Sequence, residues 1–169
     1  MEVNTMTTFV TVGTTKFDKL IETVLEDEVL MELSRRGYRR LILQIGNTNL
    51  TPDCTPRCGF EYIETFTLKP SINEYMRFAD LIISHAGAGS CLEALGAKKP
   101  LIVVTNDLLM DNHQSELAEQ LSQDKYLYQC TCATLLEVCK SMNLLQLKRF
   151  VDDKSPKIAE IIDYIMGFE

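Results

Sequence analysis

The residues whose types and spacing best suit chemistry lie together between residues 80 and 100, where a short apolar run leads into a glycine-rich turn. His85 ends the run, Gly87 and Gly89 form the turn, and a predicted helix opens at Ser90. The start of a helix exposes backbone N–H groups and the positive end of the helix dipole, and small residues before it let a phosphate approach closely. His85 and Ser90 could donate further hydrogen bonds to the same anion. The stretch therefore predicts a phosphate site.

Two structural alternatives use the same kinds of residues without any ligand. Ser90 and Glu93 have the Ser-x-x-Glu spacing of a capping box, in which serine and glutamate side chains bond to backbone N–H groups at a helix start. Thr14 and Thr15 form a second polar turn after the first β-rich run, where they could contact a ligand or only cap the next helix. The residues of these turns, taken alone, leave both alternatives open.

The strands and helices that would position these turns alternate along the chain. Apolar or β-rich runs predict strands at residues 8–12, 40–45, 61–67, 81–83, 101–105 and 126–130. Helical spacing of apolar residues predicts helices from Phe17 to near Gly37, at 71–78, from Ser90, and at 113–123, 135–142 and about 155–168. Such alternation is typical of a doubly wound, Rossmann-like α/β fold with a mainly parallel sheet covered on both faces. We predict one domain over residues 1–169, with ligands at the carboxyl ends of the strands.

Composition and charge narrow the class of protein. The chain has 169 residues, of which 46% are hydrophobic and 24% charged, as in ordinary globular proteins. Its formal net charge of −7 disfavours a nucleic-acid partner, which would need a basic face. No run approaches the roughly 18 consecutive apolar residues of a membrane-spanning helix, and the polar start is unlike a signal peptide. We therefore expect a cytoplasmic protein.

The six cysteines do not have the spacing of a metal or redox site. No Cys-x-x-Cys pair occurs, and neither histidine has ligand spacing to a cysteine. In a reducing compartment such cysteines are free thiols, packed mostly as small apolar groups. We therefore expect no metal and no disulfide framework.

Three familiar nucleotide or sugar-transfer motifs are absent. A dinucleotide-binding fingerprint needs three glycines after the first strand and an acid roughly 20 residues later. Here the first turn has the single glycine Gly13, and the second strand ends with Gln44. The chain also has no Gly-Lys-Ser/Thr phosphate loop and no Asp-x-Asp of a metal-dependent sugar transferase. A metal-independent sugar-nucleotide site remains.

At this point four segments together resemble a known enzyme family: 9–15, 40–46, 83–90 and 112–114. They are similar to the small catalytic subunit of two-chain UDP-N-acetylglucosamine transferases. The run 80–100, continued by 111–114, resembles the donor-binding C-terminal half of MurG-like GT-B glycosyltransferases. The resemblance implies an inverting, partner-dependent hexosyltransferase without a cofactor. It would move N-acetylglucosamine from UDP-N-acetylglucosamine to N-acetylglucosaminyl-diphosphodolichol, the second step of N-glycan precursor assembly.

The resemblance also implies roles for individual residues. His85 and Glu93 are the catalytic candidates, with Glu93 accepting from the ribose hydroxyls and the general base expected on a partner chain. His85 could be that base only if it does not hold the phosphate. The implied UDP-sugar contacts are Ala86, Gly87, Ala88, Gly89 and Ser90 to the diphosphate, Phe66 and Thr67 to the uracil, Asn112, His113 and Gln114 to the sugar hydroxyls, and Gly13, Thr14 and Thr15 near the transferred sugar.

The acceptor half of the enzyme has to come from elsewhere if this resemblance holds. It implies a heterodimer with a membrane-anchored, acceptor-binding subunit that holds this chain at the cytosolic face of the endoplasmic reticulum. The predicted C-terminal helix carries an apolar stripe that could dock on its own domain or on the partner: Ile158, Ile161, Ile162, Ile165 and Met166. The alternative function is a regulatory module that binds a UDP-sugar without catalysis.

Overall fold

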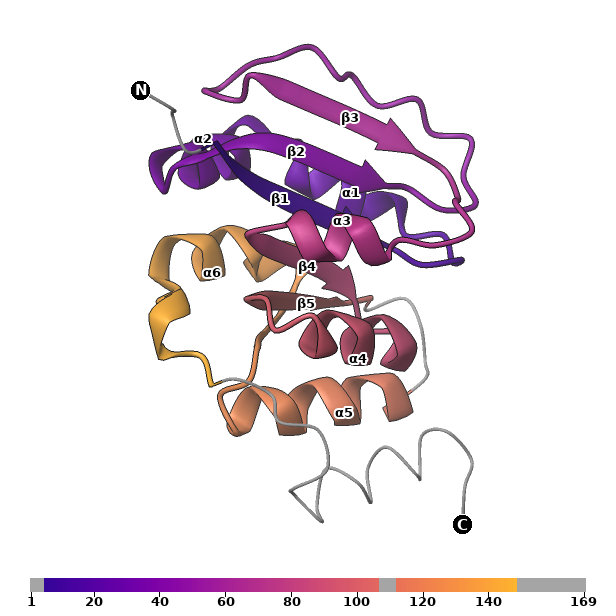
Figure 1. Ribbon diagram of the computed structural model, residues 1–169, viewed down its shortest axis with the longest axis vertical. Coiled ribbons are helices and arrows are strands. Elements are labelled where there is room, and N and C mark those ends of the chain that lie inside the picture. Colours follow the sequence, from indigo (N-terminus) through magenta and orange to yellow (C-terminus); the bar gives the residue numbers. More distant parts are fainter. Residues whose placement is uncertain (1–4, 107–111, 149–169) are drawn as a thin grey trace.

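A six-stranded parallel sheet forms the centre of the molecule (Figure 1). The structure, a computed structural model, describes residues 5–106 and 112–148. The strand order is β3-β2-β1-β4-β5-β6, so the chain first builds outward from β1 on one side and then returns to build on the other. The strands are β1 (Met6–Thr11), β2 (Tyr38–Gln44), β3 (Tyr62–Phe66), β4 (Leu81–His85), β5 (Leu101–Thr105) and β6 (Tyr128–Thr131).

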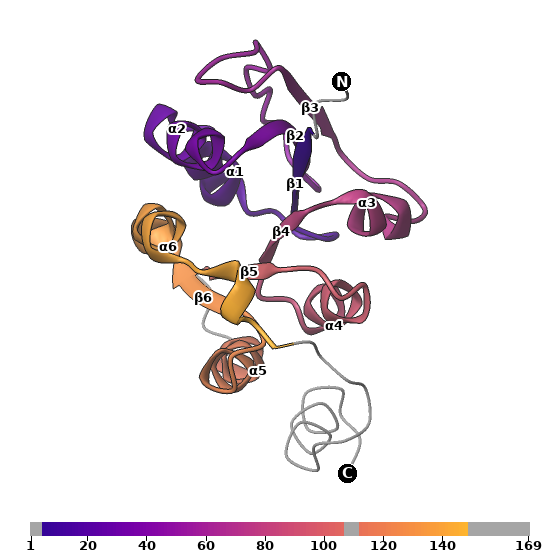
Figure 2. The same cartoon turned by 60° about the vertical axis from the view of Figure 1, so that its left-hand side comes forward.

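Helices cover both faces of this sheet (Figures 1 and 2). One face carries α1 (Asp18–Val24), α2 (Asp27–Arg35) and α6 (Leu135–Ser141), and the other carries α3 (Asn73–Phe78), α4 (Ala88–Gly96) and α5 (Asn112–Gln123). Two short 3₁₀ helices, η1 (Cys132–Thr134) and η2 (Leu144–Gln146), flank α6. None of the helices in the described ranges is long and apolar enough to cross a membrane.

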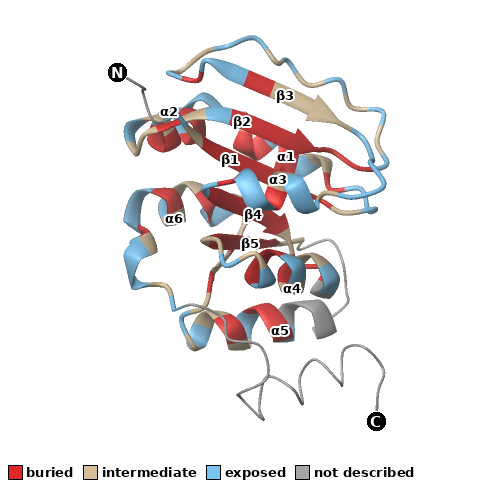
Figure 3. Cartoon of the chain, viewed as in Figure 1, coloured by how far each residue is buried: buried red, intermediate tan, exposed pale blue. Residues whose placement is uncertain are grey.

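Burial on both faces explains the continuous apolar runs of the central strands (Figure 3). Successive side chains of a strand point to opposite faces, so a sheet that is covered on both faces favours apolar residues at consecutive positions. In β4, Ile82 belongs to the core under α3, α4 and α5, whereas Ile83 belongs to the core under α1, α2 and α6. Both are fully buried. The predicted doubly wound, Rossmann-like α/β fold is confirmed.

The long helix predicted from Phe17 to near Gly37 is wrong, because the chain breaks it into α1 and α2. The backbone of Glu26 turns to an extended conformation (ψ 141°), and the bonds of α2 start there with Leu30 N donating to Glu26 O. The carbonyl of Leu25, which the break leaves without a helical partner, accepts a hydrogen bond of 3.3 Å from Arg57 Nη2. The helical spacing of apolar residues continues across the break, so the sequence pattern does not reveal that there are two helices.

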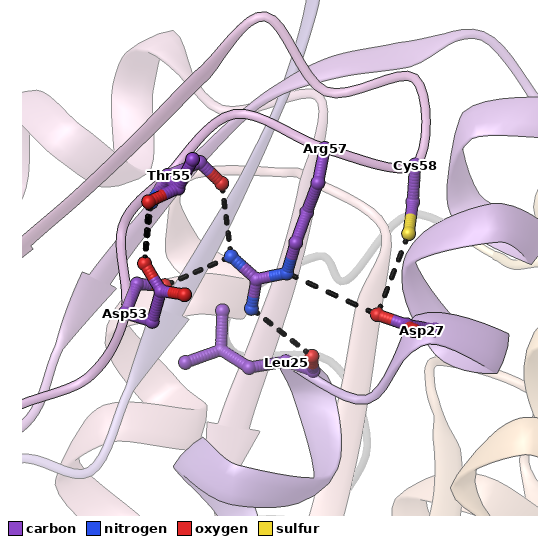
Figure 4. Close-up of polar contacts among 6 residues, drawn as sticks. All are labelled: Leu25, Asp27, Asp53, Thr55, Arg57 and Cys58. Atoms are coloured by element: carbon purple, nitrogen blue, oxygen red, sulfur yellow. Dashed lines mark hydrogen bonds and ion pairs between the residues drawn. The ribbon is translucent and has the colours of Figure 1, made fainter.

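Arg57 also organises the long loop between β2 and β3 (Figure 4). Its Nη1 donates to the carbonyls of Asp53 and Thr55, both at 2.9 Å, and its Nε lies 3.9 Å from Asp27 Oδ1. The side chain thus joins this loop to both the end of α1 and the start of α2. The guanidinium group of Arg57 thus ties the middle of a loop that composition predicts to the two helices beside it.

The predicted amphipathic helix at about 155–168 lies outside the described residues. Its docking surface, and the extent of the single domain predicted for residues 1–169, remain predictions.

Gly46 lets the loops after β1, β2 and β3 meet at one edge of the sheet. Its φ is +74°, and a Cβ atom there would lie 2.2 Å from the carbonyl oxygen of Thr15 and 2.7 Å from Val12 Cγ2. Its N–H donates to the carbonyl of Thr67 at 3.2 Å. A side chain at this position would therefore push apart loops that converge on the carboxyl ends of the strands.

We expect Gly46→Ala to lower the free energy of unfolding by about 3–4 kcal/mol, from left-handed backbone strain and overpacking against backbone. The matched control is Gly96→Ala in α4, where an added Cβ meets no atom within 4 Å and alanine favours the helix by up to about 1 kcal/mol. Urea denaturation measures both. A Gly46→Ala protein as stable as the Gly96→Ala protein would contradict the proposed crowding.

Candidate functional site

A cleft of about 460 Å³ opens at the carboxyl edge of the sheet, where the strand order reverses between β1 and β4. Open α/β sheets bind ligands at such switch points, because the loops diverge there and leave a crevice. Among the described residues, the cleft is lined by 13–15 after β1, by Gln44 at the end of β2, by 68–73 after β3, and by His85, Gly87, Gly89, Ser90 and Glu93 from β4 and α4.

The start of α4 faces this cleft without a side-chain cap. Gly87 is the N-cap residue, no side chain caps the helix, and its first backbone bond runs from Cys91 N to Gly87 O at 3.0 Å. The N–H groups of a helix's first turn have no partner within the helix. The alternative of a capping box between Ser90 and Glu93 is therefore wrong, because α4 begins two residues before Ser90.

His85 fills the space between the two glycine-containing turns. A Cβ atom on Gly13 would lie 2.8 Å from His85 Nε2, and one on Gly87 would lie 2.3 Å from His85 Cε1. The ring also contacts α4, with Nε2 lying 3.2 Å from Ser90 Oγ. The two glycines thus leave room for a histidine ring beside the helix start.

Burial lowers the pKa of His85 to about 4. The imidazole is therefore neutral at neutral pH, able to donate one hydrogen bond but without a charge. It is also a weak base. This favours the predicted role of His85 as a donor to a phosphate over the role of general base.

Two further residues of α4 present different groups to the cleft. A Cβ atom on Gly89 would meet no atom within 4 Å, so the helix surface at this position is open. Glu93, one turn further along, is exposed and lines the same cleft. Ala86, by contrast, is buried in the core beneath α4. At Gly89 the helix therefore exposes its backbone to the cleft, and one turn later Glu93 places a carboxylate there.

Gln44 lines the cleft, although in the sequence it is notable only as a residue that is not an acid at the end of the second strand. It is 3% exposed, and both ends of its amide are used. Its Oε1 accepts from Thr11 Oγ1 and from Gly13 N at 3.0 Å, and its Nε2 donates to the carbonyls of Gly13 and Thr67, the latter at 3.1 Å. A polar residue closing an otherwise apolar strand was the signal that could have identified it.

Thr14 and Thr15 are exposed and line the cleft in the turn after β1, and their contact with a sugar stays a prediction. Thr15 Oγ1 donates to the carbonyl of Val12 at 2.7 Å and so closes the turn. The alternative that these threonines only cap the next helix is wrong, because the N-cap of α1 is Phe17 and no side chain caps it.

Phe66 and Thr67 lie beside the cleft, whereas the next six residues line it. The Phe66 ring packs at 4.8 Å from that of Tyr75 and at 6.4 Å from that of Phe9. Thr67 contributes its carbonyl to Gln44. Residues 68–73 were expected only to connect a strand to a helix and to begin that helix, and their place in the cleft wall comes from the structure.

The remaining predicted contacts fall at the start of α5. Asn112, His113 and Gln114 are the first three residues of that helix, and their side chains lie outside the described part of the structure. Their contacts with sugar hydroxyls stay predictions, as does the contact at Ala88, whose side chain is likewise not described.

No group of three or more histidine, cysteine or acidic side chains within the described ranges could hold a metal ion. Burial raises the pKa of Cys91, Cys130 and Cys139 to about 12. These three thiols are therefore protonated at neutral pH and act as packing groups.

We expect the His85 ring to titrate near pH 4 in the folded protein and near its ordinary value of 6.5 in the unfolded chain. As the pH falls below 6.5, the unfolded chain binds this proton first, so the fold loses about 2–3 kcal/mol of stability by pH 4. NMR titration of the ring protons checks the pKa. His85→Gln should lose less stability than the unmodified protein between pH 7 and 4, and a ring that titrates near 6.5 would refute the burial argument.

Solved structures share this fold. A solution NMR structure of ALG13 matches with a TM-score of 0.68 and 27% sequence identity, over 94% of each chain. The crystal structure of Acinetobacter baumannii MurG matches with a TM-score of 0.66 and 18% identity, over 99% of this chain and 51% of MurG. The predicted similarity to the C-terminal half of GT-B glycosyltransferases is confirmed at the level of the fold.

The sequence comparisons are more specific. The model of the glycosyltransferase family 28 C-terminal domain matches residues 7–165. The human UDP-N-acetylglucosamine transferase subunit ALG13 is 50% identical over 127 residues, which are 75% of this chain and 11% of the human protein. The Saccharomyces cerevisiae protein of the same name is 32% identical over 187 residues, covering 91% of this chain and 93% of the yeast protein. The chain therefore belongs to the glycosyltransferase family 28 C-terminal domain family, among the homologues of the ALG13 subunit.

Proposed function

We propose that this chain is the donor-binding catalytic subunit of a UDP-N-acetylglucosamine transferase. The acceptor is N-acetylglucosaminyl-diphosphodolichol, so the reaction is the second step of N-glycan precursor assembly. The observation that carries the proposal is the uncapped start of α4, which opens into the cleft at the switch point of the sheet. Relatives that are named as UDP-N-acetylglucosamine transferase subunits support this choice of donor.

The donor's diphosphate lies on the Gly87–Ser90 turn in this proposal. Backbone N–H groups of the first turn of α4, the Ser90 hydroxyl and the neutral His85 ring donate to it. Glu93 accepts from the ribose hydroxyls, and the uracil lies toward Phe66 and Thr67. The sugar lies toward the 13–15 loop and the start of α5, where 112–114 reach its hydroxyls.

The reaction is an inverting displacement at the anomeric carbon, in which UDP leaves. Negative charge grows on the diphosphate as the glycosidic bond breaks, and preorganised donors around α4 stabilise it. A general base must take the proton of the acceptor hydroxyl. His85, with its pKa near 4, is poorly suited to that task, and we assign the base to a second chain.

The second chain is a membrane-anchored subunit that carries the acceptor-binding half. GT-B enzymes work in a cleft between two domains, and this chain matches one of them. The word "subunit" in the names of its relatives supports an obligate partner. The heterodimer would lie at the cytosolic face of the endoplasmic reticulum.

Gly89→Ala tests the position of the diphosphate without disturbing the fold. The new methyl group meets no protein atom within 4 Å, so stability should be kept, but it would stand where a phosphate approaches the helix. We expect UDP and UDP-N-acetylglucosamine to bind at least about tenfold more weakly, equivalent to about 1.4 kcal/mol. The control is Gly96→Ala, the same change at the far end of α4, and titration calorimetry or NMR measures the affinity. Unchanged affinity in Gly89→Ala would place the diphosphate elsewhere.

The partner requirement is tested by lipid-linked transfer. The purified chain should transfer no N-acetylglucosamine to the dolichol-linked acceptor, whereas the chain together with a membrane-anchored partner should do so, also in the presence of EDTA. Thin-layer chromatography of the lipid-linked product measures the transfer. Robust transfer by the single chain would refute the partner requirement. A complex that binds UDP-sugar but transfers nothing would instead favour the regulatory binding module.

A further inference from the structure

Among the described residues that line the cleft, Lys69 is the only lysine or arginine. The other titratable groups on the described walls are Glu93, which is an acid, and His85, which is neutral at neutral pH. A sugar-nucleotide diphosphate bears a negative charge on each phosphate, and the protein itself has a formal net charge of −7. The start of α4 supplies only about half of an elementary charge. Among the described residues that line the cleft, only Lys69 therefore supplies a full positive charge.

The Lys69 ammonium group is held at the cleft by two aromatic rings. Its Nζ lies 4.8 Å from the ring centroids of both Phe66 and Tyr75, and it donates a hydrogen bond to the Tyr75 hydroxyl. The rings are backed by Phe9, which is fully buried and stacks on Tyr75 at 5.4 Å. The hydrogen bond with Tyr75 raises the pKa of Lys69, so the side chain stays charged.

The backbone before Lys69 is tied to the rest of the site. The Phe66 carbonyl accepts from Ile45 N at 2.9 Å, and the Thr67 carbonyl accepts from Gln44 Nε2 at 3.1 Å and from Gly46 N at 3.2 Å. These bonds hold the backbone two residues before Lys69, so the position of its Cα is fixed. Its long side chain is exposed. Exposed cation–π contacts are weak, and a charge-assisted hydrogen bond to phosphate is stronger. A phosphate in the cleft can therefore draw the ammonium group from the rings.

We propose that Lys69 binds the diphosphate of the sugar nucleotide and stabilises the charge on the departing nucleoside diphosphate. This inference rests on the proposed function, since it assigns a residue to the same donor site. Phe66 and Tyr75 act as the resting position of the ammonium group. The cleft thus combines fixed backbone donors from α4 with one movable cation from the loop after β3.

The test compares the affinities of three lysine variants of the full chain for UDP and for uridine, measured by NMR titration. Lys69→Met should weaken UDP binding about five- to tenfold, because a charge-assisted contact is lost at an exposed site, and leave uridine binding unchanged. Lys69→Arg should restore most of the UDP affinity. Lys140→Met removes the same charge from an exposed position on α6, on the other face of the sheet, and should change neither ligand. The salt dependence of UDP binding should also be shallower in Lys69→Met.

Each other outcome is decisive. If Lys69→Met binds UDP as tightly as the unmodified chain does, the assignment of Lys69 is wrong. The proposed donor site is still supported in that case, because the unmodified chain binds UDP. Equal weakening of UDP and uridine also overturns the assignment of Lys69, since Lys69 would then act at the base. If Lys140→Met weakens UDP binding as much as Lys69→Met does, the loss reflects the overall charge of the protein, and the assignment of Lys69 is wrong. Failure of the unmodified chain to bind UDP would overturn both proposals together.

Discussion

The amide of Gln44 is the contact on which the cleft depends. It lies at the end of β2, buried between the loops after β1 and β3, and it bonds to Gly13 through both its oxygen and its nitrogen. A third bond holds Thr67. Because a buried amide loses about 1–3 kcal/mol for each group left unpaired, the loops cannot separate cheaply. The uncharged side chain of Gln44 therefore helps to hold the walls formed by 13–15 and 68–73, together with backbone bonds such as that from Gly46 N to the Thr67 carbonyl.

The arrangement around His85 follows from that constraint. With the Gly13 loop held in place, the imidazole has room only because neither Gly13 nor Gly87 carries a side chain. The packed ring becomes neutral, and the bare start of α4 remains beside it. The site therefore presents hydrogen-bond donors that are fixed by the fold. Such preorganised donors suit a reaction in which charge develops on a leaving diphosphate.

The aromatic cluster beyond β3 links the core to the mouth of the cleft. Phe9 belongs to the core under α3, α4 and α5, and Phe66 and Tyr75 continue the stack outward to Lys69. Packing in the core thus determines where the exposed ammonium group of Lys69 lies. The Lys69 ammonium group thus lies at the mouth of the cleft, opposite the backbone donors at the start of α4 that line the same cleft.

The sequence by itself determined the fold class and most elements, because strands buried on both faces are mainly apolar, as residues 81–83 of β4 and 101–104 of β5 are. It also identified Gly87 and Gly89 as the place of a candidate phosphate site, because small residues leave the start of a helix open, although the structure places Gly89 within α4. Only the tertiary structure showed where α1 ends, because Arg57, which binds the Leu25 carbonyl, comes from a distant loop. It also showed that Gln44 and 68–73 line the cleft. The pKa of His85 was equally inaccessible, since burial arises from packing. Local pattern predicts elements, whereas contacts between loops far apart in the chain make the cleft.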